Sequence, residues 1–236
     1  MAGLASRFKV GQRHIVKPMI KIGGIPMIEL VLETLNLPGK YIFILRDDVI
    51  FDELEYLLKK KMSDCKIIKI AKLSRGPADT VLAASNEINN NDPLIIANSD
   101  QIMNWDSKKF LLHLDNNTLD GVVVTFSSSE SQNSYAKINK DGFVTCIKEK
   151  EVISNYALNG IHFWKYGKYF VESAKAMIDS RIKTNGEFYV GPTYNYLINK
   201  GLSIGIYPLL KSEHFPVGTP IDLKKYEENF AKIRAK

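Results

Sequence analysis

The residues best suited to chemistry stand at the start of the chain, in the segment Met1–Phe8. Small side chains there allow the backbone to approach a phosphate and to point successive N–H groups at it; they belong to Ala2, Gly3, Ala5 and Ser6. Arg7 adds a forked cation, and Lys17, directly before Pro18, adds a mobile one. Binding of a triphosphate requires this combination of fixed dipoles and positive charge. An ordinary turn between a strand and a helix, with two solvated cations, would show the same residues.

Strand and helix patterns alternate through the first half of the chain. The predicted strands are Lys40–Leu45, Cys65–Leu73 and Pro93–Ala97, and the predicted helices are Pro26–Leu35, Val49–Met62 and Pro77–Ile88. This alternation predicts a layered α/β sheet with helices on its faces. The wholly apolar strand Pro93–Ala97 is of the parallel-sheet type. Ligands of such sheets gather at the carboxyl ends of strands, where Asn98 and Asp100 directly follow Ala97.

The second half of the chain has a different pattern of predicted elements and contains more strands. Predicted strands are Gly121–Ser127, Tyr135–Asn139, Phe143–Lys148, Tyr156–Trp164 and Leu202–Leu209; helices are predicted at about 166–182, at 190–200 and at 221–234. The sequence Lys140–Gly142 signals a hairpin turn. No repeat and no low-complexity linker interrupts the pattern, so one domain is expected.

Several segments, taken in order along the chain, resemble a known family. They are Met1–Phe8, Lys17-Pro18, Asn98–Gln101, Glu149-Lys150 with Asn159–Ile161, Glu187–Pro192 and Gly218–Pro220. Together they resemble the nucleotide-diphospho-sugar pyrophosphorylases, which are sugar-phosphate nucleotidylyltransferases, over nearly the whole chain. The resemblance implies a three-layer, mostly parallel α/β sheet of the nucleotide-diphospho-sugar transferase (Rossmann-like, GT-A-type) fold. It also implies a single domain, 1–236, with a nucleotide-binding half (about 1–126) and an acceptor-binding half (about 127–236).

The first motif departs from the family pattern G-x-G-[ST]-R, because Ala5 replaces the second glycine. Val16 stands where the family often has proline before the lysine. The family also has an apolar strand ahead of this loop, whereas the sequence opens on the loop itself. Either the true start lies upstream, or this protein lacks that strand and a central sheet position is empty.

The resemblance implies roles for the residues that handle the triphosphate. Arg7 and Lys17 would bind it and stabilise the charge that leaves on pyrophosphate. Asp100 would ligate Mg²⁺, which nucleotidyl transfer needs to neutralise the triphosphate; a loop that leads into Asp106 and a helix is the alternative. The nucleotide would contact the backbone loop, at Ala2, Gly3, Leu4, Ala5 and Ser6.

A second metal carboxylate is harder to identify. The family often has it just before the Gly-Thr near its C-terminus, where this chain has Pro216 and Val217. Asp222 is the available substitute as a metal ligand. It is equally suited to be the favourable charge at the start of the last helix.

The turn Gly76–Asp79 reads the base in the family, so Gly76 and Ala78 are predicted to contact it, together with Asn98. A simple helix start with Asp79 in its first turn is the alternative. On the acceptor side, the resemblance places Glu149 at the sugar and Lys150 at the acceptor phosphate; a charged hairpin edge is the alternative. Further predicted substrate contacts are Gln101, Asn159, Gly160, Glu187 and Tyr189. Tyr189 could equally be an aromatic residue packed under a loop.

Composition narrows the classes of function. The net charge is +6, but Lys and Arg are scattered rather than striped, so no nucleic-acid partner is expected. No apolar run has membrane-spanning length and no signal pattern opens the chain, which predicts a cytoplasmic protein without membrane association. Cys65 and Cys146 are expected to be buried free thiols. The four histidines lack ligand spacing, and His162 is expected to be a core or rim residue.

These features predict an enzyme that joins an NTP to a phosphorylated small acceptor, most simply a sugar 1-phosphate, with release of pyrophosphate. Its state would be a monomer or homodimer, and its product would serve nucleotide-sugar supply for capsule or surface polysaccharide. One alternative is a metal-dependent glycosyltransferase, although that class usually carries a D-x-D pair and Asn98 occupies the first position here. A catalytically weakened subunit that binds a nucleotide sugar is the other.

Overall fold

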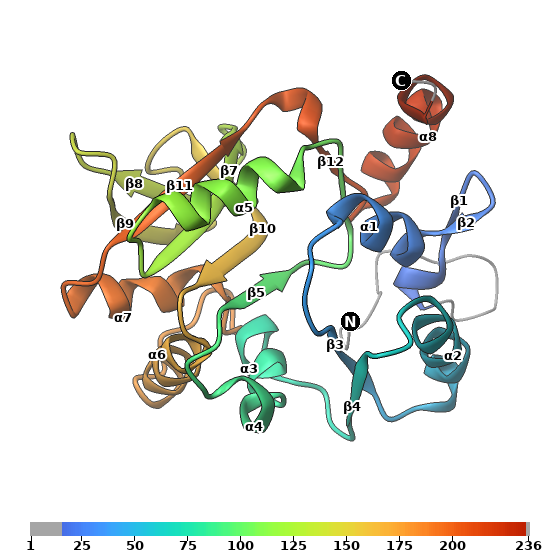
Figure 1. The fold of residues 1–236 in the computed structure, drawn as a ribbon, viewed down its shortest axis with the longest axis horizontal. Helices are drawn as coiled ribbons and strands as arrows, with labels where there is room; N and C mark the ends of the chain where they lie inside the picture. The colour runs from blue at the N-terminus through green and yellow to red at the C-terminus, as the bar shows by residue number, and fades with distance from the viewer. Residues whose placement is uncertain (1–15, 235–236) are drawn as a thin grey trace. The chain divides into compact units, whose positions relative to one another are not determined.

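The computed structural model describes residues 16–234 of the chain. The chain forms two compact units, each built from segments that are distant in sequence (Figure 1). The first comprises Met1–Leu73, Ser99–Trp105 and Ser212–Lys236, and the second comprises Ser74–Asn98 and Asp106–Lys211. The sequence predicted a different division, at about residue 126, between a nucleotide-binding half and an acceptor-binding half. That division concerns the ligand that each half binds, and it stays a prediction.

The first unit contains short strands and three helices in its described residues. In chain order its elements are η1 (Lys17–Met19), β1 (Lys21–Ile22), β2 (Ile25–Pro26), α1 (Met27–Leu35), β3 (Ile42–Arg46), η2 (Val49–Phe51), α2 (Asp52–Lys61), β4 (Lys66–Ile70), β6 (Gln101–Met103), β12 (His214–Pro216) and α8 (Pro220–Arg234), where η denotes a 3-10 helix. The predicted helices at 26–35 and 221–234 are confirmed, and so are the strands at 40–45 and 65–73, within a few residues.

Helix α1 shows how the sequence sets the bounds of an element. Pro26 precedes it with φ fixed at −53°, and Asn36 ends it in the left-handed conformation with φ +43°. Its apolar residues recur at helical spacing and bury one face, to which Leu30 and Val31 belong. That face belongs to one core with Leu45 of β3.

The second unit carries the main sheet. Its elements are α3 (Pro77–Leu82), α4 (Ser85–Ile88), β5 (Leu94–Ala97), α5 (Ser107–Asn116), β7 (Gly121–Ser127), β8 (Ser134–Ile138), β9 (Val144–Glu149), β10 (Tyr156–Trp164), α6 (Gly167–Asp179), η3 (Gly191–Thr193), α7 (Tyr194–Asn199) and β11 (Ile204–Leu209); η4 (Lys211–Glu213) spans the boundary between the units in sequence. β7 and β10 have the predicted bounds. The predicted helix Pro77–Ile88 is divided, because Ala83 and Ala84 donate to the carbonyls three residues back and tighten the turn.

The strand order of this sheet is β11-β7-β10-β8-β9, and β5 also pairs with β10. β11 pairs parallel with β7, whereas β5, β7 and β8 all pair antiparallel with β10. Strands β5, β7, β8 and β11 therefore run in one direction, and β10 runs between them in the other. The prediction that Pro93–Ala97 sits in a parallel pairing is wrong in this respect, because its neighbour in the sheet is the reversed strand β10.

Ring contacts fix two helices on this sheet. Phe110 of α5 meets Tyr207 of β11 edge to face at 5.1 Å between centroids, and Phe170 of α6 meets Trp164 of β10 at the same distance. The fold class is confirmed as mixed α/β with a central multistranded sheet. Apolar side chains at helical spacing on α5 and α6 produce this packing.

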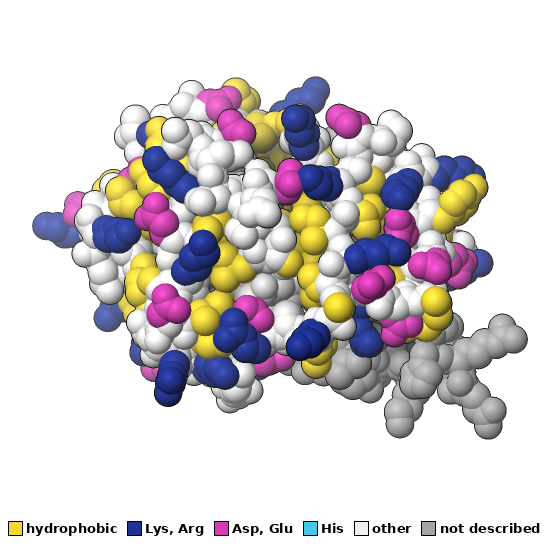
Figure 2. All heavy atoms as spheres, turned by 90° about the horizontal axis from the view of Figure 1, so that it is seen from below, with side chains coloured by type: hydrophobic (Ala, Val, Ile, Leu, Met, Phe, Trp, Pro, Cys, Tyr) yellow, Lys and Arg dark blue, Asp and Glu magenta, His cyan; other side chains and the backbone are white. Residues whose placement is uncertain are grey.

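The surface charge, the helices and the cysteines were each the subject of an expectation from the sequence composition. Basic and acidic side chains are interspersed on the face drawn in Figure 2, with no continuous basic stripe among its coloured residues. Among the helices of residues 16–234, none has the length and apolar character needed to span a membrane. Cys65 and Cys146 are free thiols, as predicted, but both are half-buried rather than buried.

Candidate functional site

Two of the predicted catalytic residues contact each other in the first unit. The Lys17 ammonium lies 2.6 Å from Oδ2 of Asp100, and each side chain is about a quarter exposed, at 24% and 26%. Lys17 opens η1, where Pro18 follows it, and Asp100 directly precedes β6. The third predicted catalytic residue, Arg7, lies outside the described residues, as do Ala2, Gly3, Leu4, Ala5 and Ser6.

Gly218 lies beside this ion pair. A Cβ built on Gly218 would lie 3.0 Å from Oδ2 of Asp100 and 3.6 Å from Nζ of Lys17. The backbone N–H of Val217 donates to the carbonyl of Asp100 at 2.9 Å, next to the antiparallel pairing of Pro216 with Gln101. The Gly-Thr-Pro motif predicted from the sequence is thus held against Asp100. Gln101 itself has a buried side-chain oxygen to which no described residue donates.

Asp222 has a local partner at the start of α8. Its Oδ2 accepts a hydrogen bond from the Thr219 hydroxyl at 2.6 Å, and its backbone N–H donates back to that hydroxyl at 3.2 Å. This exchange is typical of a helix N-terminus, with Thr219 as the N-cap. The contact supports the structural alternative for Asp222, and its role as a metal ligand stays a prediction.

The described residues contain no group of three or more Asp, Glu, His or Cys side chains placed to hold a metal ion. Asp100 supplies one carboxylate. Mg²⁺ typically takes one or two protein carboxylates and completes its shell with phosphate oxygens and waters. The donor set therefore fits a Mg²⁺ ion that arrives with a triphosphate, and it does not form a cage for the metal alone.

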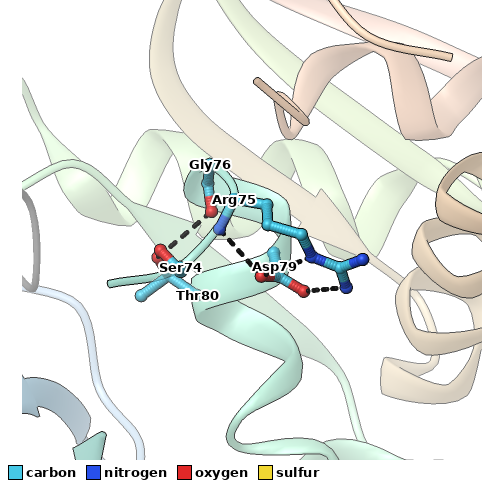
Figure 3. A network of polar contacts seen from close by, with 5 residues as sticks. All are labelled: Ser74, Arg75, Gly76, Asp79 and Thr80. Atoms are coloured by element: carbon cyan, nitrogen blue, oxygen red, sulfur yellow. Dashed lines mark hydrogen bonds and ion pairs between the residues drawn. The ribbon is translucent and has the colours of Figure 1, made fainter. Parts of the chain in front are cut away.

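The predicted base-contact turn lies in the second unit and carries a dense polar network (Figure 3). Asp79 accepts hydrogen bonds from the backbone N–H of Arg75 at 2.9 Å and from its guanidinium at 2.8 and 3.2 Å. The guanidinium holds the pKa of the Asp79 carboxyl below its usual range. The Thr80 hydroxyl contacts the Ser74 hydroxyl and donates to the carbonyl of Gly76 at 3.1 Å. The N–H of Ala78 is already engaged, because it donates to the carbonyl of Phe188.

Asn98 lies against Gly160. The N–H of Asn98 donates to the carbonyl of Gly160 at 3.1 Å, and a Cβ on Gly160 would lie 2.1 Å from the Asn98 side-chain nitrogen. Gly160 has φ +95°, within a shift of register between β10 and β7. Asn159 is buried and accepts from the N–H of Ile161 at 2.9 Å. The glycine thus lies at an irregularity within the continuous strand β10 and leaves room for the side chain of Asn98.

Some of the predicted acceptor residues form one cluster, around Tyr189. Lys150 donates to the Tyr189 hydroxyl at 2.6 Å and lies 4.7 Å from the centre of its ring, and that hydroxyl donates to Glu187 at 2.7 Å. Glu149 is the last residue of β9, and Lys150 adopts a left-handed conformation with φ +56°. The strand therefore ends and the chain turns between these two residues, so strand alternation does not force them onto opposite faces.

Burial raises the pKa of the Glu149 carboxyl above its usual range, although a hydrogen bond from Ser134 and the charge of Lys150 act in the opposite direction. Ser134 donates to Oε2 of Glu149 from the paired position on β8. The sequence did not single out Ser134. Counting residues outward from the predicted turn at Lys140–Gly142 would have placed it opposite Lys148, because the shift of register between Lys137 and Ile138 that brings it to Glu149 leaves no signal in the sequence.

His162 is a core residue, as expected. Its ring lies beside the stacked rings of Trp164 and Tyr194, at 5.9 and 6.0 Å between centroids, and burial lowers its pKa to about 3. The ring is therefore neutral at ordinary pH. It takes no part in the polar clusters described above.

The fold of this chain is that of the nucleotide-diphospho-sugar pyrophosphorylases. The nucleoside-diphosphate-sugar pyrophosphorylase from Vibrio cholerae RC9 has a TM-score of 0.83 to it at 22% identity, over 96% of this chain and 97% of that one. A UDP-glucose pyrophosphorylase complexed with UDP-glucose gives 0.77 at 15% identity, over 98% and 96%. The inositol-1-phosphate CTP transferase from T. maritima gives 0.76 at 11% identity, over 99% and 93%.

The chain belongs to the nucleotidyl transferase family, whose sequence model matches residues 2–188. It is accordingly an enzyme, a nucleotidyltransferase, and the resemblance drawn from the ordered motifs is confirmed. Among curated proteins, none matches this chain in sequence.

Proposed function

We propose that this nucleotidyltransferase joins an NTP to a sugar 1-phosphate, or to a similarly phosphorylated small acceptor, and releases pyrophosphate. The nucleotide would be bound mainly by residues up to about 126 of the single domain 1–236, and the acceptor by residues beyond them. A cytoplasmic location and a monomeric or homodimeric state belong to the same proposal. So does a place in the supply of nucleotide sugars for capsule or surface polysaccharide.

The observation that carries the acceptor class is the cluster around Tyr189. Glu149 and Glu187 offer carboxylates that can accept hydrogen bonds from neighbouring hydroxyls of a sugar, while Lys150 offers a cation for a phosphate. Tyr189 contacts both Lys150 and Glu187, so these groups from two distant segments lie at one place. Carboxylates that accept hydrogen bonds from hydroxyls, placed beside a cation that binds phosphate, suit a phosphorylated polyol.

The reaction needs no protein nucleophile. An oxygen of the acceptor phosphate attacks the α-phosphorus of the NTP in line, a new P–O bond forms, and the bond between the α-phosphorus and the bridging oxygen breaks, so that pyrophosphate leaves. Lys150 would orient the attacking phosphate, and Lys17, with Arg7, would stabilise the negative charge on the leaving group. Mg²⁺ bound by Asp100 and the nucleotide would neutralise part of the triphosphate charge. Lys17 is paired with Asp100, so it must exchange that partner for the triphosphate.

A pyrophosphate-release assay tests this function. ATP, GTP, CTP, UTP and dTTP would each be combined with glucose 1-phosphate, inositol 1-phosphate and phosphocholine in the presence of Mg²⁺. We expect release for one NTP together with one phosphorylated polyol. Phosphocholine is the discriminating acceptor, because Lys150 already occupies the face of Tyr189 on which a quaternary ammonium would stack.

The control for the chemistry is the pair Asp100→Asn and Asp106→Asn. Within residues 16–234, the hydrogen bond of the Asp106 side chain is the one from the N–H of Lys108 at the start of α5, so its substitution should leave turnover unchanged. Asp100→Asn should lose most turnover while the protein stays folded. Sugar transfer from a nucleotide sugar without pyrophosphate chemistry would refute the proposal, as would full activity of Asp100→Asn at limiting Mg²⁺.

A further inference from the structure

Phe188 joins two predicted parts of the site through its backbone. Its N–H donates to the carbonyl of Arg75 at 3.0 Å, and its carbonyl accepts from the N–H of Ala78 at 3.0 Å. These two hydrogen bonds flank Gly76, the centre of the predicted base-contact turn. Glu187 stands immediately before Phe188 in the chain, and Tyr189 immediately after it.

The approach of the two segments depends on Gly76. Its φ is +135°, and a Cβ there would lie 2.5 Å from the backbone nitrogen of Phe188 and 2.6 Å from its oxygen. Backbone atoms cannot yield as a flexible side chain can. The turn and the Phe188 backbone are therefore in direct contact, without an intervening side chain, and a shift of one segment displaces the other.

Side chains also fix the conformation of the Gly76 turn. The carboxylate of Asp79 holds both the backbone N–H and the guanidinium of Arg75 (Figure 3). The same guanidinium lies 5.5 Å from the centre of the Phe188 ring, and Lys183 Nζ lies 4.9 Å from it. The ring itself is buried. Asp79 thus orients Arg75, which contacts Phe188 through both its carbonyl and its side chain.

We propose that Asp79 is a positioning residue, which couples occupation of the Gly76 turn by the nucleotide base to the placement of Glu187 and Tyr189 in the acceptor cluster. The inference rests on the proposed function, because it takes the turn as the base contact. When a base packs against the turn, the Phe188 hydrogen bonds become more persistent. The Tyr189 hydroxyl is then held where it accepts from Lys150.

Hydrogen–deuterium exchange on the full chain measures this coupling directly. Peptides that cover residues 74–80 and 184–190 would be followed with and without each of the five NTPs and Mg²⁺. In the wild type, the NTP that binds should slow exchange in both peptides. In Asp79→Ala, exchange at 184–190 without nucleotide should be about tenfold faster, since a charge-assisted hydrogen-bond set is lost, and the NTP should protect only 74–80.

Three further variants sharpen the test. Arg75→Ala should act in the same direction but less, because Asp79 still accepts from the backbone N–H of residue 75. Asp79→Glu keeps the charge and should restore part of the coupling. Asp106→Ala removes a comparable helix cap outside the turn and should leave both peptides unchanged. Unchanged exchange in the strands β7 and β10 would show that each variant is folded.

The outcomes separate the two levels of inference. If an NTP protects 74–80 but never 184–190 in the wild type, or if Asp79→Ala behaves as the wild type, the coupling is wrong and the base contact stands. If no NTP protects 74–80, the base contact is wrong, and the coupling falls with it. Joint protection that Asp79→Ala abolishes at 184–190 alone supports the positioning role.

Discussion

Replacing Lys17 with methionine should make it easier for a divalent cation to bind Asp100 when no nucleotide is present. The Lys17 ammonium lies 2.6 Å from Oδ2 of Asp100 and occupies one side of the carboxylate. Mg²⁺ binds carboxylate oxygens at about 2.0–2.1 Å, so the ammonium must leave before the ion takes that side. Methionine keeps most of the length and apolar stem of lysine and removes only the competing charge.

The size of the effect follows from the exposure of the pair. Both side chains are about a quarter exposed. The interaction free energy of the pair should therefore lie near the upper end of the range for solvent-accessible ion pairs, at about 1 kcal/mol. Loss of a competitor of that strength corresponds to about a fivefold tighter binding of the metal. A much larger gain would mean that the pair is effectively desolvated.

Mn²⁺ serves as the probe, and its free concentration can be followed by electron paramagnetic resonance in a titration without NTP. The wild type, Lys17→Met, Asp100→Asn and Lys200→Met would be compared. Lys200 forms a surface pair with Glu172 at 3.3 Å and serves as the matched control for loss of one lysine charge. Equal Mn²⁺ affinity in Lys17→Met and the wild type would refute the competition. Binding that survives in Asp100→Asn would place the metal elsewhere.

Three other predictions follow. Lys17→Ala should lower kcat by at least about tenfold with a modest change in KM for the NTP, because its contact with the leaving group is made chiefly in the transition state; steady-state kinetics showing only a raised KM would reduce Lys17 to ground-state binding. Glu149→Ala should raise KM for the acceptor about tenfold or more, while calorimetry shows unchanged NTP binding, and the opposite pattern would contradict the acceptor assignment. Stability should fall as the pH drops from 6.5 towards 3, because burial lowers the pKa of His162 from 6.5 to about 3 and the unfolded chain binds the proton more readily. In His162→Phe, denaturant unfolding should show a smaller loss over that range, by a few kcal/mol at most, and an identical pH profile would show that His162 does not titrate in this way.

Much of the fold could be predicted from local signals. β7 and β10 are long apolar runs bounded by turn residues, and their bounds match the prediction. β6 was missed, because three residues give no periodicity and its partner β12 lies more than a hundred residues away. The direction of β10 relative to β5 is likewise a property of the pairing, and the sequence of neither strand indicates it.

The candidate site also has a part that could be predicted from the sequence and a part that could not. Residue types and motif order were enough to nominate Lys17 and Asp100, and the structure brings these two into contact. The contact of Phe188 with the Gly76 turn could not be predicted, because it joins segments more than a hundred residues apart through backbone atoms. Only the glycine carried a signal, and a glycine before Pro77 is equally expected at a plain helix start.

Backbone conformation marks three of the predicted site positions independently of their side chains. Gly76, Lys150 and Gly160 all have positive φ, at +135°, +56° and +95°. Glycine adopts such angles without strain, whereas for lysine the left-handed conformation costs about 1 kcal/mol. Lys150 remains there because its N–H donates to the carbonyl of Asn133 at 3.0 Å and its ammonium reaches Tyr189. A glycine at that position would relieve the strain and lose the cation that contacts Tyr189, and the left-handed lysine is consistent with the proposed acceptor-phosphate role of Lys150.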